Sequence, residues 1–411
     1  MAVADLTDWI TEFGRPGAVW YAKRLSGNDT LATQSHQAGP YIPKEFLFRM
    51  FPQVNKPEAE NPDYRFELYI DSHSDHRTAR AIWYNNKLRG GTRNESRLTG
   101  FGGRQSALLD PESTGALAVF AFLLNEDGSA RECHVWVCRN EIEEDLIEDR
   151  LGPVEPKEVR IWEPGSPLTM LFAVAKPAHR ATCHLDASEI PPEWLKKFPR
   201  GEEIIRKTTE LRPLRGTPVD IRLVRRRTCE YELFKSVEEA FYLPRITQGF
   251  NSIEGFIGLA QTILQSRKSR SGNSLEYHVR DLMIEEGLTS GTDFTHGPRI
   301  EVNKRPDFLF PSQAAYEDKT FPDANLRMLA AKTTCKDRWR QICNEADRVK
   351  SKHLLTLQEG VSEAQFREMQ EANVQLIVPT EVQDSYPSSV RPHLITFESF
   401  LADIRLLNLK D

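Results

Sequence analysis

An acid and a lysine, each at the end of an apolar run, are the first residues here that could share chemistry. Asp307 opens "PDFLFP", and Lys332 closes "MLAAK" 25 residues later. Two such strands can bring the pair to one rim of a sheet, where the carboxylate would hold Mg2+ and the lysine would orient or help to deprotonate a water molecule. This pairing suits phosphodiester hydrolysis, but it needs another carboxylate. Two places before Lys332, where a metal-dependent nuclease usually carries one, stands Ala330.

A second carboxylate is available beyond the lysine. Residues 335–349 show the spacing of three and four that is typical of a helix with one buried stripe. At ~100° per residue, Glu345 flanks that stripe, about 40° from Val349, and could reach back beneath the sheet rim. By itself the spacing favours a simpler interpretation, a boundary carboxylate on an amphipathic helix. The stripe would consist of Trp339, Ile342, Cys343, Ala346 and Val349.

The elements that must position these side chains alternate between helix and strand. Helical patterns cover residues 237–246, 252–268 and 274–287, and strand patterns cover 306–311, 327–334, 353–360 and 374–380. Such alternation predicts an α/β domain with a central mixed sheet in the second half of the chain.

The first half is instead rich in short strands separated by turn residues. They are predicted at 18–25, 64–71, 80–86, 115–124, 133–138 and 168–175, which indicates a mainly β barrel or sandwich. The acidic stretch 140–152 is predicted as a solvated helix. Prolines, glycines and eight basic residues between Arg206 and Arg227 mark a change of composition. We therefore expect a domain at 1–190, a linker region at 191–220 and a second domain at 221–411.

Composition sets the outer bounds. A chain of 411 residues is long enough for two cores, and its net charge of -6 neither implies nor excludes nucleic acid, because net charge averages over opposing faces. The N-terminus lacks the pattern of a secretion signal, and no run of 18 apolar residues occurs, so we expect a soluble, cytoplasmic protein without membrane partners. The six cysteines are scattered, and their spacing supports neither a disulfide framework nor a zinc site.

Taken together, Asp307 after Pro306, Lys332 in "AAKTTCKDRWRQICNEA" and Glu345 thirteen residues later resemble the rearranged PD-(D/E)xK site of EcoRII-type restriction endonucleases. In that family the second acidic ligand has moved from two places before the lysine to the following helix. The resemblance covers nearly the whole chain. It implies that Asp307 and Glu345 bind Mg2+, that Lys332 serves the attacking water, and that Glu276 in "SLEYH" is an additional active-site acid.

The same resemblance assigns DNA contacts in the second domain. Lys336, Asp337 and Arg338 match the family's base-reading triplet, and the chemistry agrees, because Lys and Arg donate to guanine while Asp accepts from cytosine. Arg227 and Tyr231, spaced i,i+4, match a pair that holds a base flipped from the centre of the site. A solvated helical turn for the triplet and a surface cation–π contact for the pair are the alternatives.

Three polar loops of the first domain resemble those of the EcoRII-type effector domain, a pseudobarrel similar to plant B3 DNA-binding domains. Two positions that carry lysine in the family pattern are Gly91 and Ser96 here, which removes two possible DNA contacts. Arginine, glutamate and arginine at alternating positions of an extended segment would point to one side, as a major-groove reader needs. The DNA-binding residues implied are Lys23, His36, Tyr41, Arg93, Glu95 and Arg97.

The resemblance implies a type II restriction endonuclease that cuts double-stranded DNA at a CC(W/N)GG-like site. A palindromic site calls for a homodimer, expected through the second domain. The family also implies a first domain that binds a second site and otherwise covers the catalytic cleft, and a cognate DNA methyltransferase as functional partner. The rival is a DNA-binding regulator with a nuclease-like domain that has lost catalysis; a weaker rival is a repair or structure-specific nuclease.

Overall fold

The computed structural model describes the whole chain except residues 1, 34–38, 165–182, 302–303, 337 and 409–411. It contains two compact units. The first comprises Met1–Val174, Gln358–Phe366 and Ser385–Arg391, and the second comprises Ala175–Leu357, Arg367–Asp384 and Pro392–Asp411. The domain boundaries expected from the sequence stay a prediction, and the strand expected at 168–175 lies outside the described residues.

The first unit is built on a seven-stranded sheet in the order β4-β3-β2-β6-β5-β1-β7. Every neighbouring pair is antiparallel except β2 and β6, which run parallel. The mainly β character predicted for this half is therefore confirmed, and its B3-like pseudobarrel form stays a prediction. The strands are β1 (Ala18–Arg24), β2 (Asp63–Ile70), β3 (Asp75–Tyr84), β4 (Glu95–Thr99), β5 (Leu117–Leu124), β6 (Ala130–Val137) and β7 (Val159–Trp162).

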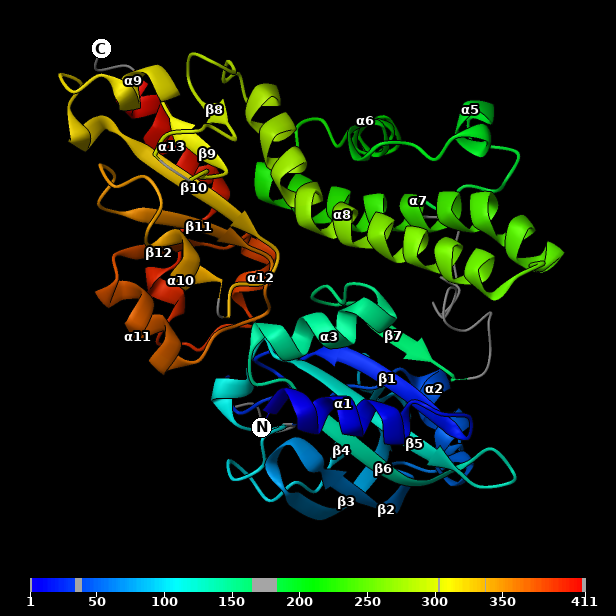
Figure 1. The fold of residues 1–411 in the computed structure, drawn as a ribbon. Helices are drawn as coiled ribbons and strands as arrows, with labels where there is room; N and C mark the ends of the chain where they lie inside the picture. The colour runs from blue at the N-terminus through cyan, green and yellow to red at the C-terminus, as the bar shows by residue number, and fades with distance from the viewer. Residues whose placement is uncertain (1, 34–38, 165–182, 302–303, 337, 409–411) are drawn as a thin grey trace. The chain divides into compact units, whose positions relative to one another are not determined.

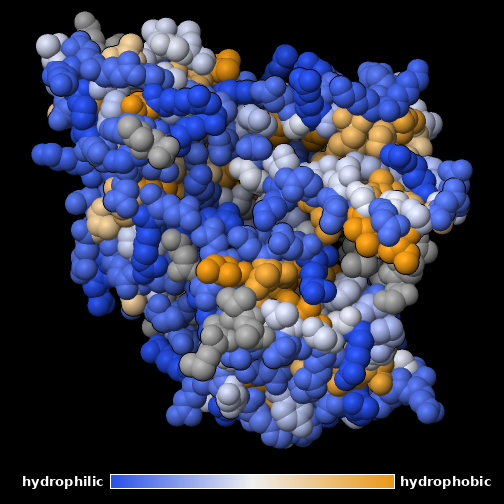
Figure 2. Space-filling view, in the orientation of Figure 1, coloured by the Kyte–Doolittle hydropathy of each residue, from blue (hydrophilic) through white to orange (hydrophobic). Residues whose placement is uncertain are grey.

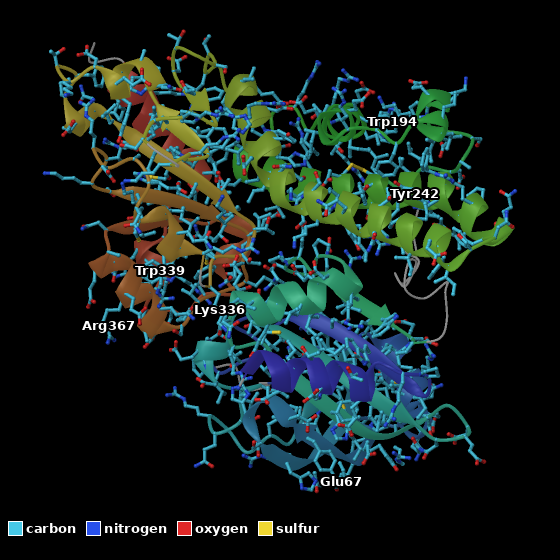
Figure 3. All side chains as sticks on the ribbon, viewed as in Figure 1. Glu67, Trp194, Tyr242, Lys336, Trp339 and Arg367 are labelled. Atoms are coloured by element: carbon cyan, nitrogen blue, oxygen red, sulfur yellow. A yellow bond between two sulfur atoms is a disulfide. The ribbon has the colours of Figure 1, made fainter. Side chains whose placement is uncertain are left out.

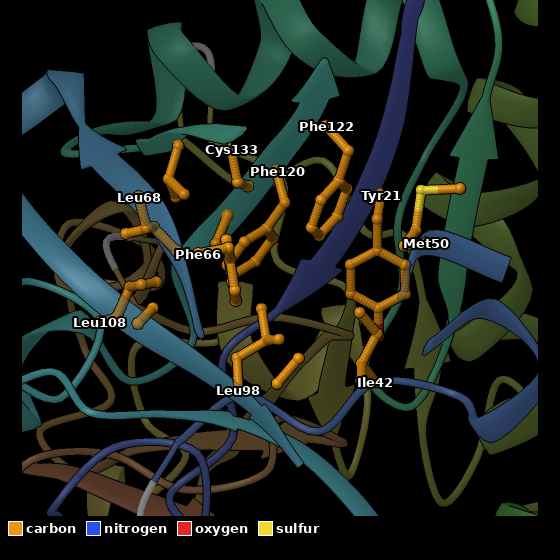
Figure 4. Close-up of a cluster of buried hydrophobic side chains, with 14 of the residues drawn as sticks. Tyr21, Ile42, Met50, Phe66, Leu68, Leu98, Leu108, Phe120, Phe122 and Cys133 are labelled. Atoms are coloured by element: carbon orange, nitrogen blue, oxygen red, sulfur yellow. The ribbon is translucent and has the colours of Figure 1, made fainter. Parts of the chain in front are cut away.

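Both faces of the central strands are buried, because alternate residues of β1 and β5 enter two different clusters. Tyr21 and Phe120 join the cluster in Figure 4, together with α2 (Lys44–Met50). Trp20 and Val119 join the other cluster, which α1 (Ala2–Phe13) and α3 (Glu141–Leu151) cover. This explains why these strands read as continuous apolar runs rather than as alternating ones.

Helix α3 corrects one expectation, since it is not simply solvated. The Glu143 side chain is fully buried and accepts a hydrogen bond from Trp136 Nε1 at 3.1 Å. Glu144 pairs with Arg24 at 2.7 Å, and Glu148 pairs with the same guanidinium at 2.8 Å. The acidic composition therefore serves buried partners on neighbouring strands, which charge patterning along the chain does not reveal.

The second unit has a five-stranded mixed sheet in the order β12-β11-β10-β9-β8, which confirms the α/β prediction. Strands β10, β11 and β12 are parallel, and β9 pairs antiparallel with both β10 and β8. The bounds are β8 (Thr295–His296), β9 (Phe308–Phe310), β10 (Arg327–Lys332), β11 (Lys352–Thr356) and β12 (Val374–Ile377).

Two long helices form a hairpin beside this sheet: α7 (Val219–Gln248) and α8 (Ile253–Glu285). The stretches predicted as separate helices at 252–268 and 274–287 are one continuous helix. The segment expected as a linker contains α5 (Pro192–Lys196) and α6 (Gly201–Leu211), and Trp194 of α5 packs with Leu233 of α7. The remaining helices are α9 (Gln313–Glu317), α10 (Trp339–Ile342), α11 (Glu363–Glu371), α12 (Thr380–Gln383) and α13 (Phe397–Asn408).

The helix predicted at 335–349 is largely wrong, because only α10 forms. Ala346 takes a φ of 49°, which a helix does not allow. The Lys352 ammonium donates to the carbonyls of Glu345 and Ala346, so a side chain from β11 binds oxygens that the next helical turn would otherwise use. The chain therefore turns, although the predicted stripe still packs inward, with Trp339, Ile342 and Val349 buried.

Four further observations complete the fold. A disulfide joins Cys183 to Cys229 on α7, although the cysteine spacing gave no support for a disulfide. Among the described helices, none combines the length and apolar composition needed to cross a bilayer. The face shown in Figure 2 is largely hydrophilic, with apolar side chains gathered in limited patches. Short 3-10 turns lie at Pro52–Val54, Asp71–His73, Asn86–Arg89, Pro111–Ser113, Asp323–Asn325 and Arg391–His393.

Candidate active site

The structure brings Asp307 and Lys332 together at the rim of the second sheet. Asp307 immediately precedes β9, Lys332 ends β10, and the two strands are antiparallel neighbours. The Lys332 Nζ lies 3.0 Å from Asp307 Oδ2, and the backbone N–H of Ala331 donates to the same oxygen at 2.8 Å. Asp307 is only 9% exposed. The neighbouring strand β10 therefore fixes the carboxylate through its backbone and its terminal lysine.

Glu345 interacts electrostatically with Asp307 and Lys332, although it comes from a turn instead of a helix. Burial first, and then the negative charge of Asp307, raises the pKa of Glu345 to about 7. The Lys352 bonds to the carbonyls of Glu345 and Ala346 hold this turn. The position two places before the lysine carries Ala330, which is fully buried in the sheet. Glu345 replaces the missing acid, and the fold of the chain brings it close to Asp307.

Glu276 approaches from α8, which packs its Leu275 and Val279 into the core beneath the sheet. The pKa of Asp307 is raised first by burial, whereas Lys332 lowers it. The negative charge of Glu276 is the next influence and raises it further. Burial is the largest single influence and lowers the pKa of Lys332, but the nearby carboxylates, Asp307 foremost, together raise it overall, so the ammonium stays charged. The Glu276 Oε2 lies 3.4 Å from Nε2 of His296 on β8. The sequence gave no local signal for His296 or for Lys352.

The donor set fits a divalent cation bound to few protein ligands. The pKa values of Asp307 and Glu345 are both raised, chiefly by burial, so a cation there would relieve the cost of holding two anions. In the described part of the chain, no group of three His, Cys, Asp or Glu side chains is close enough to hold a metal ion. Two carboxylates completed by phosphate and water oxygens is a common ligand pattern for Mg2+.

The segment expected to read bases directly follows β10. Lys336 and Arg338 are half-buried, and Figure 3 shows Lys336 near Trp339, which begins α10. Asp337 lies outside the described residues. The chain therefore places the two described members of the triplet four and six residues beyond Lys332.

Arg227 and Tyr231 do share one helix, α7, as their spacing predicted. The Arg227 guanidinium is buried, and it binds the Glu230 carboxylate and the Ser274 hydroxyl. The Arg270 guanidinium lies 5.1 Å from the centre of the Tyr231 ring. The pair expected to hold a flipped base thus sits in a network of charges that packs α7 against α8.

In the first unit, five of the six predicted DNA-binding residues line one cavity of about 440 Å³, and His36 lies outside the described residues. The side chain of Glu95 accepts from Arg93 at 3.0 Å and from Arg97 at 3.3 Å. Ser96 lies between Glu95 and Arg97 on β4, and its side chain points away from theirs and donates to the Ile42 carbonyl at 2.6 Å. The alternation predicted for this segment therefore holds. The five residues are Lys23, Tyr41, Arg93, Glu95 and Arg97.

Two family models match this chain. The one described as "Restriction endonuclease EcoRII, N-terminal" covers residues 14–166, and the one described as "EcoRII C terminal" covers residues 234–401. With the rim acid, the lysine and the α/β sheet, these matches define a type II restriction endonuclease, an enzyme that cleaves DNA sequence-specifically. The type II restriction enzyme EcoRII of Escherichia coli is 42% identical over 406 residues, 98% of each chain. The chain belongs to the EcoRII family.

Two more distant similarities complete the comparison. The type II restriction enzyme SsoII of Shigella sonnei is 28% identical over 158 residues, which is 37% of this chain and 50% of that protein. A structure of metal-depleted Ecl18kI in complex with uncleaved, modified DNA is 21% identical, with a TM-score of 0.43, and it covers 55% of this chain and 86% of that one.

Proposed function

We propose that this enzyme cleaves double-stranded DNA at a CC(W/N)GG-like site with Mg2+ as cofactor, using Asp307, Lys332, Glu345 and Glu276. The observation that carries the proposal is the convergence of these four charged side chains at one sheet rim from four separate parts of the chain. Bound Mg2+ would neutralise the paired carboxylates and lower the pKa of a water molecule.

The chain's own residues divide the remaining work. Asp307 and Glu345 would hold the cation, since both anions are destabilised by burial and by each other. Lys332, kept charged by Asp307, would orient the attacking water and stabilise charge on the scissile phosphate. Glu276 would act as an auxiliary acid beside them.

Recognition in this proposal comes from the segment that follows the catalytic lysine. Lys336 and Arg338 would donate to guanine and Asp337 would accept from cytosine, which reads two adjacent C·G pairs. Arg227 and Tyr231 would hold a flipped central base by stacking. A homodimer follows from the twofold symmetry of such a site, and a methyltransferase protecting the same site would be the functional partner.

The first unit would bind a second copy of the site through Lys23, His36, Tyr41, Arg93, Glu95 and Arg97, and would restrain the catalytic unit until then. An enzyme built this way should cut a single-site plasmid slowly and faster when a short duplex carrying the site is added.

One experiment tests the core of the proposal. The purified enzyme is incubated with a plasmid of known sequence and Mg2+, and the cut ends are mapped. Cuts confined to sites with a CC/GG frame are expected, and cuts elsewhere would refute the assigned role of residues 336–338. Specific binding without Mg2+-dependent breaks would instead favour the catalytically inactive regulator.

A further inference from the structure

His296 is the one side chain of β8 that contacts a proposed active-site acid. Its Nε2 lies 3.4 Å from Oε2 of Glu276, which comes from α8. The contact is long for a hydrogen bond, but catalytic hydrogen bonds are often long before substrate binds and shorten in the complex. His296 thus joins the helix that carries Glu276 to the edge of the sheet.

The imidazole ring is held in place from two sides. It stacks on Phe308, with ring centres 4.9 Å apart and planes 22° from parallel. Its ring centre lies 6.1 Å from that of Tyr277, and these two rings form a T-shaped pair. Backbone pairing fixes the same register, because His296 lies opposite Phe308 and the Gly297 N–H donates to the Asp307 carbonyl at 2.8 Å. The ring is therefore tied to the strand that begins directly after Asp307.

We propose that His296 is a positioning residue for the reaction, which holds the Glu276 carboxylate at a fixed place relative to Asp307 and Lys332. The inference rests on the role proposed above for Glu276. In this proposal the His296 Nε2–H donates to the Glu276 carboxylate, because an ionised carboxylate only accepts hydrogen bonds. Without this donor, Glu276 could turn away from a site where its charge already acts on Asp307 and on Lys332.

The molecule contains a matched control. His76 in the first unit places Nε2 2.6 Å from Oε2 of Glu67, and its ring stacks on Tyr69 with centres 4.3 Å apart. The chemistry of this pair is the same, but it lies on β2 and β3, outside the proposed site. His76→Ala therefore removes a similar contact with no expected effect on cleavage.

The test uses the full chain with His296→Ala, Glu276→Gln and the double variant, together with His76→Ala. We expect His296→Ala to slow single-turnover cleavage by about 10-fold to 100-fold, as loss of an orienting partner commonly does. The double variant should cut no more slowly than Glu276→Gln alone, since His296 acts through Glu276. His296→Gln, whose amide N–H can replace Nε2–H, should recover most of the rate.

A second measurement needs no activity. In metal-free protein, the shifts of the urea midpoint caused by His296→Ala and Glu276→Gln should not add up to the shift of the double variant if the contact exists. The shifts caused by His76→Ala and Glu276→Gln should add when these two changes are combined. The proposal would be overturned if the rate loss of the double variant equalled the product of the two single losses. It would also be overturned if the two single shifts of the urea midpoint added up to the shift of the double variant. If Lys332→Ala still cleaves, the proposed function itself fails. If Lys332→Ala is inactive while His296→Ala cleaves normally, only the role of His296 fails.

Discussion

Two lysine–aspartate pairs, one in each unit, look alike and behave in opposite ways. Lys23 and Asp29 lie 2.7 Å apart in the first unit, and Lys332 and Asp307 lie 3.0 Å apart in the second. Burial pushes the pKa of both aspartates upward, yet the pKa of Asp29 is lowered overall and that of Asp307 is raised.

The neighbours explain the difference. Asp29 also accepts backbone hydrogen bonds from Ser26 and Tyr41, each 2.8 Å long, so its anion is fully satisfied. Asp307 accepts hydrogen bonds from Lys332 and from the Ala331 backbone, and it faces the negative charges of Glu276 and Glu345. The first pair stabilises a fold, whereas the second keeps anions at a cost that a substrate or cation could relieve.

The largest expected effect concerns the lysine of the second unit. Lys332→Ala should slow cleavage by about 10³-fold, because it removes the group that orients water and stabilises the phosphate charge. Specific binding of a duplex carrying the site should persist. Single-turnover cleavage and mobility-shift assays measure the two properties, with Lys56→Ala in a first-unit loop as control; undiminished cutting would contradict the site.

The two aspartates should differ in their effect on folding. Asp29→Ala leaves the Lys23 ammonium buried without its partner, which costs about 3–5 kcal/mol of unfolding free energy. Asp307→Asn removes an anion held at a cost and should change the unfolding free energy by less than about 1 kcal/mol, or raise it, while cleavage is lost. Urea unfolding measures both, against Asp8→Asn on the exposed side of α1. Equal losses of unfolding free energy would contradict the difference between the two aspartates.

A smaller effect depends on pH. The folded-state pKa of Glu345, about 7, lies above its ordinary 4.5, so between these values the folded protein binds more protons than the unfolded one. Stability must therefore fall as pH rises through this window, by about 1–3 kcal/mol. Glu345→Gln should flatten that slope in metal-free protein.

Asp29, with its lowered pKa, contributes stability that is lost only as pH falls below about 4. Thermal unfolding between pH 3 and 8 follows both.

The smallest effect concerns an exposed pair. The Arg93 side chain is 79% exposed, and its ion pair with Glu95 should add almost nothing to stability. Arg93→Ala should leave the urea midpoint unchanged within error but weaken DNA binding by the first unit. The salt dependence of that binding should drop by about one unit in slope. An unchanged slope would remove Arg93 from the DNA contact.

The sequence predicted those parts of the molecule that short-range patterns determine. The strands that end at Lys332 and begin after Asp307 are visible as apolar runs, and their meeting follows from sheet geometry. The helix expected at 335–349 fails because Lys352, on another strand, binds the carbonyls of the turn. Partners distant in sequence likewise decide the burial of Glu143 and the disulfide between Cys183 and Cys229. His296 lies in a two-residue strand, too short for any period to show.

Lys352 also bears on how such a site can change over time. An acid two places before the catalytic lysine is positioned by its own strand and needs no further support. Once the acid is carried by a turn, a second residue must anchor that turn, and here β11 provides the anchor. The two changes are therefore useful only together. Relatives whose acid follows the lysine at this distance should keep a donor at the start of β11, and relatives with the acid on the strand should be free to lose it.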